Sequence, residues 1–344
     1  MRAINHLTKY FLSNKGNRDE YLSRPTALAS WWNNSTILGG RDIKNPQQSG
    51  TWLGINRYGR FAAITNYRDP DHSSEVKTVF DDNKSLGLNE SKTPLSRGIL
   101  INKILESQET PLDEIMRVEV EARAENYGGY NIITMDLANQ GKNKNTNDSN
   151  DENDCHTFYF ANRRDIRLQT LKSGEIYGLS NSVLDDPWPK VEMGKCEFQK
   201  ILDNKTLSES DMTVPFKPKS TIPEILENIR LTIHVPECQL HGTYATRTNT
   251  IVLVDYSNRV VFVERTVFDE ARASNNYCYS HISADRFNTT SDTDTSIDDF
   301  IVAITNEVNN DKVKESDDTQ QQQSFFKSDD HKDRVFQFKI QKRD

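Results

Sequence analysis

Cysteine and histidine are the residues of this 344-residue chain that could supply nucleophilic, redox or metal-binding chemistry. The four cysteines are widely spaced, and no C-x-x-C pair occurs among Cys155, Cys196, Cys238 and Cys278. No apolar secretory signal follows Met1, so the composition favours reduced, mostly buried thiols over disulfides. We therefore expect a cytosolic protein, or one in an organelle that keeps thiols reduced.

The seven histidines are His6, His72, His156, His234, His241, His281 and His331. None belongs to a C-x-x-C-H motif, so covalent haem attachment is not expected. If haem is bound, Cys155-His156 and His241 next to Gly242 are the candidate ligands. An isolated histidine is seldom a ligand without a supporting shell, and a carrier can also hold haem in an apolar cleft without ligation. We expect no metal site, and no cofactor beyond haem as a possible cargo.

Charge placement limits the classes of partner. The net charge is −8, and residues 284–333 alone carry 13 acidic and 5 basic side chains. The remainder is therefore near neutral and lacks a basic footprint for nucleic acid. No apolar run is long enough to span a bilayer. The first 18 residues contain four basic and no acidic side chains, which is typical either of a weak mitochondrial presequence or of a basic N-terminal strand.

The elements that must position any site are strands in hairpins with helices between them. Strand pairs are predicted at residues 51–66 around Gly59, at 130–137 with 157–161, at 166–171 with 175–179, and at 250–267. Helices are predicted within residues 94–125, with a start at Thr110-Pro111, and at residues 187–204 and 221–229. No strand–helix alternation with a Gly-rich phosphate loop occurs. We therefore predict an α+β fold and not a doubly wound one.

Two polar segments interrupt this pattern. Residues 139–154 contain six Asn, four acids and no large apolar residue, which predicts a disordered loop inserted in a hairpin. Residues 269–333 form an acidic low-complexity insertion with four consecutive Gln at 320–323, and residues 334–340 alternate like a closing strand. We therefore expect residues 1–344 to form a single domain with polar insertions. The acidic insertion also leaves open a scaffold that binds a basic partner.

Several motifs occur in the order of one family. They are NRDEYLSRPT (17–26), GGRD (39–42), GTWLGI (50–55), AITNY (63–67), YGGYNII (127–133), YGLSN (177–181) with Pro187-Trp188, and TRTNTIVLVD (246–255). Each motif is weak alone, but together they span residues 17–267. The chain thus resembles the transport and Golgi organisation protein 2 family, whose signature Asn-Arg-Asp-Glu is Asn17, Arg18, Asp19 and Glu20, followed by Arg24.

The family is similar in pattern to N-terminal-nucleophile hydrolases. The resemblance implies a four-layer αββα sandwich of two antiparallel sheets between helix layers. In such hydrolases an N-terminal Cys is the nucleophile, its own amine can serve as base, and an Arg, an Asp, an Asn and a second Arg surround it. The matching residues here are Arg18, Asp19, Asn181 and Arg247. The nucleophile has no match, because this chain begins Met1-Arg2.

The same side chains also have structural interpretations. Arg18, Asp19 and Glu20 could form an ion-pair network at a strand end. Asn181 suits a turn, and Arg247 could pair with an acid. Trp52 is expected in the core, although it is also a candidate ligand contact. The full set of candidate ligand contacts is Trp52, Asn66, Arg247 and Asn249.

The resemblance implies a cytoplasmic protein, associated in some members with mitochondria or Golgi, that acts in Golgi organisation, secretion and haem or lipid handling. We expect a carrier or regulator with a haem or acyl-lipid ligand, because paired guanidinium hydrogen bonds suit propionate or phosphate groups. The alternative is an N-terminal-nucleophile amidohydrolase, which requires a Met-Cys start. Protein partners are not indicated.

Overall fold

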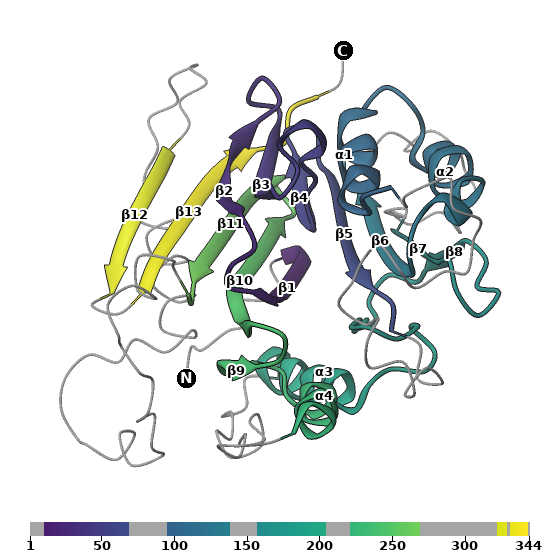
Figure 1. Cartoon of the computed structure of the whole chain (residues 1–344). Helices are drawn as coiled ribbons and strands as arrows, with labels where there is room; N and C mark the ends of the chain where they lie inside the picture. Colours follow the sequence, from purple (N-terminus) through teal and green to yellow (C-terminus); the bar gives the residue numbers. More distant parts are fainter. Residues whose placement is uncertain are drawn as a thin grey trace.

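The computed structural model of the chain describes residues 10–68, 95–137, 157–203, 221–268, 322–328 and 331–342. The predicted loop at 139–154, most of the insertion at 269–333 and the N-terminal nine residues lie outside these ranges. So do Cys155, His156 and Cys278. Two antiparallel sheets dominate the described part, with few helices (Figure 1), which confirms the α+β class.

The seven-stranded sheet is a simple meander. Its order is β2-β3-β4-β5-β6-β7-β8, so each strand pairs with the next one along the chain. The strands are β2 (Thr26–Trp32), β3 (Ile37–Asp42), β4 (Leu53–Asn56), β5 (Arg60–Asn66), β6 (Tyr130–Asp136), β7 (Thr157–Ala161) and β8 (Gln169–Leu171). The predicted hairpin around Gly59 is confirmed, since Gly59 has φ +84° between β4 and β5. The predicted β6–β7 pair is confirmed as well.

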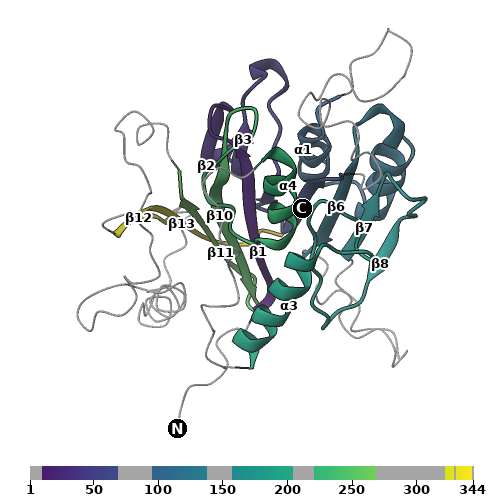
Figure 2. The same cartoon turned by 60° about the horizontal axis from the view of Figure 1, so that its bottom comes forward.

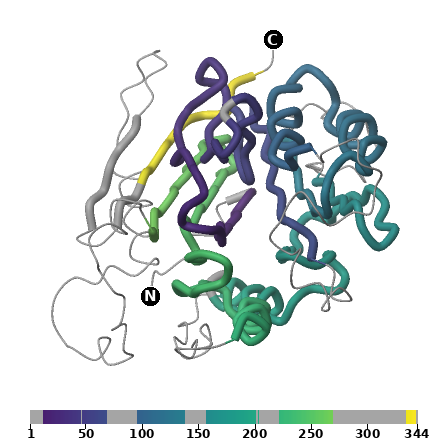
Figure 3. Tube along the Cα trace, in the orientation of Figure 1, coloured from purple at the N-terminus to yellow at the C-terminus, as the bar shows by residue number. Residues whose placement is uncertain are grey.

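The other sheet joins the two ends of the chain. Its order is β1-β10-β11-β13-β12, with β9 on β10. The strands are β1 (Tyr10–Tyr21), β9 (Cys238–Gln239), β10 (Thr243–Asp255), β11 (Arg259–Thr266), β12 (Gln322–Ser328) and β13 (His331–Lys339). In this sheet the green strands β10 and β11 lie between the N-terminal strand β1 and the yellow C-terminal strand β13 (Figure 3). The predicted 250–267 hairpin and the closing strand at 334–340 therefore both form.

Two predictions about strands differ from the structure. Residues 175–179 form no strand, and β8 pairs with β7 instead. Strand β12 falls inside the predicted insertion at 269–333, because the exposed edge of β13 offers unpaired backbone groups that even a polar segment can use. The basic N-terminal segment contributes strand β1, which runs for 12 residues through the signature because β10 supplies a partner along its length.

The two sheets pack face to face. Their shared core contains Leu12 of β1, Val252 and Val254 of β10, Phe262 of β11 and Phe336 of β13 against residues of the other sheet. Those residues are Ala29, Leu38, Leu53, Ile55 and Phe61. Alternate residues of each strand point into this layer, as the period of two requires. Burial of these side chains is the main force that holds the sheets together.

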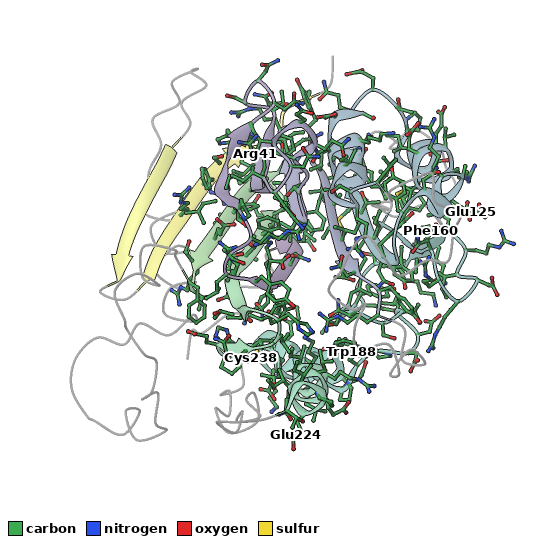
Figure 4. The ribbon with its side chains drawn as sticks, viewed as in Figure 1. Arg41, Glu125, Phe160, Trp188, Glu224 and Cys238 are labelled. Carbon is green, nitrogen blue, oxygen red and sulfur yellow. The ribbon has the colours of Figure 1, made fainter. Side chains whose placement is uncertain are left out.

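Helices cover the outer face of the meander. α1 (Gly98–Glu106) buries Leu100, Ile101, Ile104 and Leu105 on one stripe, at about 1.5–3 kcal/mol each. α2 (Leu112–Ile115) follows Pro111, as predicted, and continues as a π-helix over Met116–Glu121. These helices share a core with Ile37, Ala62, Tyr130 and Ile132 of the sheet. Phe160, which Figure 4 labels, belongs to the same core.

A second helix pair lies beside β9 and β10, as Figures 1 and 2 show. α3 (Pro189–Leu202) and α4 (Ile222–Leu231) confirm the two predicted amphipathic helices. Thr221 begins α4 with a capping box, in which its backbone N–H donates to the Glu224 carboxylate at 2.7 Å. Ile225 and Ile229 pack with Trp188, Val235 and Tyr244. This pair therefore anchors to the end of β10 that lies next to the signature.

Candidate functional site

The signature lies inside strand β1, where it pairs with the TRTNT motif of β10. The register places Asn17 opposite Asn249 and Arg18 opposite Thr248. The register then shifts, and Asp19 lies opposite Thr246, so β10 carries one extra residue, Arg247, at a β-bulge. Two motifs that are about 230 residues apart in sequence are therefore direct neighbours.

Arg18 points into the layer between the two sheets. Its guanidinium lies over the ring of Trp52, with 4.2 Å from Cζ to the ring centroid, and its residue is 8% exposed. The nearest carboxylate is Glu20, with 3.8 Å between Nη2 and Oε2. The pKa of Arg18 is lowered to about 10, mainly by burial; Arg247 and Arg24 also lower it, while Glu20 and Asp42 raise it. The side chain stays charged at neutral pH, but its charge is incompletely compensated.

Asp19 faces the opposite side of β1, toward α3 and α4. Its Oδ1 accepts a hydrogen bond from the Thr246 hydroxyl, and its Oδ2 lies 3.6 Å from Nζ of Lys190. Its backbone carbonyl accepts from the Tyr244 hydroxyl at 3.1 Å. Lys190 is itself buried, and desolvation lowers its pKa while Asp19 opposes that effect. Adjacent residues of the signature thus serve two different faces of the sheet.

Arg247 holds the chain segment that follows β1. Its Nη1 donates to the backbone carbonyls of Tyr21 and Arg24, and the residue is 7% exposed. Arg24 in turn pairs with Asp42 at 2.7 Å and lies 3.5 Å from Glu20. The predicted ion-pair network of Arg18, Asp19 and Glu20 is present, because Arg18 and Arg24 each contact Glu20 and Lys190 contacts Asp19. Arg247 Nη1 donates to main-chain carbonyls.

The candidate asparagines occupy two separate places. Asn249 donates to Asn17 at 2.8 Å, and Asn17 donates to the Ile233 carbonyl, so this pair ties β1 and β10 to the segment after α4. Asn181 donates to the Asn66 carbonyl at 2.9 Å, at the end of β5. Its own carbonyl accepts from the Arg68 backbone N–H. Asn181 thus fastens its loop to β5, as its turn preference suggests.

The structure adds four residues that the sequence analysis does not name as candidates: Arg68, Lys190, Tyr244 and Glu264. Arg68 acts electrostatically on both Lys190 and Tyr244, which links the Asn181 loop to the Asp19 side of the site. Glu264, on the inner face of β11, is 1% exposed and accepts the Ala29 backbone N–H at 2.6 Å. Burial raises its pKa to about 7. Its signal in sequence is that it is the single acidic residue of β11 (Arg259–Thr266) and follows the apolar run Val260–Val263.

Neither of the described cysteines resembles an activated nucleophile. Cys238 is buried beside Tyr244 (Figure 4), and desolvation, with Asp19 and Glu237, raises its thiol pKa to about 11. Cys196 is an exposed free thiol on α3. His241 is exposed in the turn between β9 and β10. Across the described ranges, no group of three His, Cys, Asp or Glu could hold a metal ion.

A hollow of about 300 Å³ lies against α1, α2 and the π-helix rather than at the signature. It is lined by Lys103, Ser107, Thr110, Glu114, Ile115, Val118 and Glu119. Among the described helices, none is long and apolar enough to cross a membrane.

The signature carries fixed charged groups on both faces of β1. One face has the buried Arg18 guanidinium stacked on Trp52, and the other has the ion pair between the Asp19 carboxylate and the Lys190 ammonium.

Comparison with known proteins agrees with the motif order. The sequence profile described as Transport and Golgi organisation 2 matches residues 3–269. The Transport and Golgi organization 2 homolog of Mus musculus is 31% identical over 281 residues, covering 76% of this chain and 88% of the relative. The Homo sapiens homolog is 30% identical with the same coverage. Transport and Golgi organization protein 2 of Drosophila melanogaster is 25% identical over 288 residues, covering 75% and 87%. The chain therefore belongs to the transport and Golgi organisation 2 family.

Proposed function

We propose that this protein is a carrier or regulator without strong catalytic activity that acts in Golgi organisation, protein secretion and haem or lipid trafficking. Its family membership and the names of its relatives support the Golgi assignment. The two packed antiparallel sheets with helices on the meander are compatible with an N-terminal-nucleophile-hydrolase-like sandwich. We place its action in the cytoplasm, with contact to mitochondria or Golgi.

The observation that carries the proposal is the Arg18 guanidinium. It is buried and fixed over Trp52, and its ion pair with Glu20 is long, with 3.8 Å between Nη2 and Oε2. A fixed, undercompensated cation is a binding site for an anionic group, because ordering the donors beforehand removes much of the cost of binding. A haem propionate or a phosphate of an acyl-CoA supplies such a group.

Haem and a long-chain acyl-CoA should therefore be titrated into the purified chain, following haem by its absorbance and acyl-CoA by calorimetry. Arg18→Met should weaken binding about 10-fold or more, since a hydrogen bond to a charged group contributes about 1.5–3 kcal/mol. Arg57→Met is a matched control, because Arg57 lies over the Trp31 ring at 3.9 Å in another part of the structure. The proposal would be contradicted if neither haem nor acyl-CoA bound, or if Arg18→Met and Arg57→Met weakened binding equally.

The alternative is an amidohydrolase. The fixed position of the Asp19 carboxylate favours this alternative. Thr246 and Lys190 hold the carboxylate at the signature end of β1. The amidohydrolase also requires a thiolate at the mature N-terminus, because the buried Cys238 thiol stays protonated at neutral pH. N-terminal sequencing and the intact mass of protein purified from its own cells decide this point. A mature chain that starts with Cys supports the hydrolase, and one that starts at Met1 or Arg2 supports the carrier.

A further inference from the structure

The inner face of the β1-β10-β11 sheet changes character along its length. Because directly paired residues share a face, the register defines rows of side chains that point toward the meander. The row through Val252 and Phe262 is mostly apolar and belongs to the shared core. Two rows further along, the register aligns Arg18 of β1, Thr248 of β10 and Thr266 of β11. We call these three residues the Arg18 row.

The Arg18 row is buried and unsatisfied. Arg18, Thr248 and Thr266 are 8%, 3% and 5% exposed. Arg18 Nη1, Thr248 Oγ1 and Thr266 Oγ1 are each shielded from solvent and have no hydrogen-bond partner among the described residues. One such atom would be a local irregularity. Three on adjacent strands of one face place a guanidinium and two hydroxyls in one row, and each costs about 1–3 kcal/mol if it stays unpaired.

The charge around the row favours an anion. Glu20, Arg247, Asp42 and Arg24 act electrostatically on Arg18, and Arg18 also interacts with Glu264. With Arg18 itself this makes three cations and three carboxylates, so one positive charge is left where Glu264 is protonated. Glu264 lies in the row between, opposite Thr250 and Arg334, and burial raises its pKa to about 7. Below pH 7 it is largely neutral and does not compete for Arg18.

Both hydroxyls and the guanidinium can act as donors at once. The Trp52 ring beneath the guanidinium holds Arg18 in the layer between the sheets, so Nη1 cannot swing to solvent without losing that contact. Paired residues on neighbouring strands have Cβ atoms about 4.5–5.5 Å apart, which lets two Thr hydroxyls reach different oxygens of one small anion. The arrangement matches an oxyanion and would not suit a cation, since Arg18 has no acceptor.

We propose that Arg18, Thr248 and Thr266 together form an oxyanion site between the two sheets, which receives a carboxylate or phosphate group of the ligand. This inference rests on the proposed carrier function for the role of Arg18, and it adds the two threonines as the residues that determine recognition. The threonines donate hydrogen bonds while Arg18 supplies both charge and a hydrogen bond.

The test is calorimetric titration of inorganic phosphate and, separately, acetate into the full chain at pH 6 and constant ionic strength. Thr248→Val and Thr266→Val remove one hydroxyl each at nearly constant volume. Each should weaken binding of the preferred anion about 10-fold, and Arg18→Met should abolish it. Tighter phosphate binding identifies a phosphate ligand group, whereas tighter acetate binding identifies a carboxylate. Thr134→Val is the control, because the Thr134 hydroxyl donates to the Phe61 carbonyl on the other sheet.

Thermal unfolding of the same variants provides a second readout. Without an anion, the proposal predicts that the valine variants are as stable as the wild type or more stable, because each removes an unpaired buried hydroxyl. If ordered water alone satisfies the row, neither anion binds, and the valine variants are less stable because each loses a hydrogen bond to water. That result overturns the proposal, as does anion binding that survives in both valine variants. Loss of haem and acyl-CoA binding with retained phosphate or acetate binding would contradict the carrier function but keep the oxyanion site. The two proposals can therefore fail independently.

Discussion

Glu264 gives the sharpest prediction about pH. Its carboxyl lies between the sheets, accepts the Ala29 backbone N–H at 2.6 Å, and is faced by two cations, Arg18 of β1 and Arg334 of β13. Both cations and the N–H lower its pKa, but desolvation is the largest effect and raises the pKa from 4.5 to about 7. The folded protein therefore holds this proton more tightly than the unfolded chain does.

The sign follows from linkage. Since the folded-state pKa is raised, the stabilisation by the proton is fully present below pH 4.5 and is lost as the pH rises through about 7. At about 1.4 kcal/mol per pH unit, the free energy of unfolding should fall by roughly 2–3 kcal/mol between pH 5 and pH 8 because of this group alone. Glu264→Gln keeps the acceptor for Ala29 and removes the titration.

The assay is urea unfolding of the wild type and the Glu264→Gln variant at several pH values from 5 to 8. As the pH rises, the wild type should lose stability that the Glu264→Gln variant keeps. The free energy of unfolding of the variant minus that of the wild type should therefore increase. Glu227→Gln, on the exposed face of α4, should follow the wild type at every pH. Parallel pH profiles for the wild type and Glu264→Gln would refute the reasoning.

Three further predictions concern stability, and each is checked by urea unfolding. Arg60→Met should cost about 3–5 kcal/mol, because it leaves the 4% exposed Asp136 carboxylate without the guanidinium 2.7 Å away, and adding Asp136→Leu should recover much of the loss. Thr221→Ala should cost about 1 kcal/mol by removing the capping box of α4; no change would mean that the cap is replaced by water. Gly50→Ala should lower the free energy of unfolding by about 3 kcal/mol, since the added Cβ would lie 2.5 Å from the Gly98 backbone carbon. A variant as stable as the wild type would contradict this packing.

Much of the fold could be predicted from local pattern. The alternation at residues 51–66 and 250–267 and the helical stripe near Leu100 depend on side chains a few positions apart, so sequence spacing alone indicates them. The absent strand at residues 175–179 and the unexpected β12 show the limit of this reasoning. Whether an edge strand forms depends on a partner that is distant in sequence.

The sequence predicted part of the membership of the site but not its arrangement. The motif order identifies Arg18, Asp19 and Arg247, because a signature lists residue types. It cannot indicate that Arg18 and Asp19 face opposite sides of β1, or that Arg247 lies at a bulge and donates to backbone carbonyls. Those facts follow from the pairing of β1 with β10. The hydrogen bond from Asn181 to the Asn66 carbonyl likewise joins residues that are distant in sequence, so sequence spacing does not indicate it.

The sequence by itself determined the family, the α+β class and the position of most elements, because these depend on local periodicity and on motifs read in order. Tertiary structure alone decided which side chains became buried donors. Thr248, Thr266 and Glu264 are unremarkable strand residues in sequence, and only the register of three strands brings them beside Arg18. Burial then sets their energetics, since a polar group costs free energy only where the fold removes it from water.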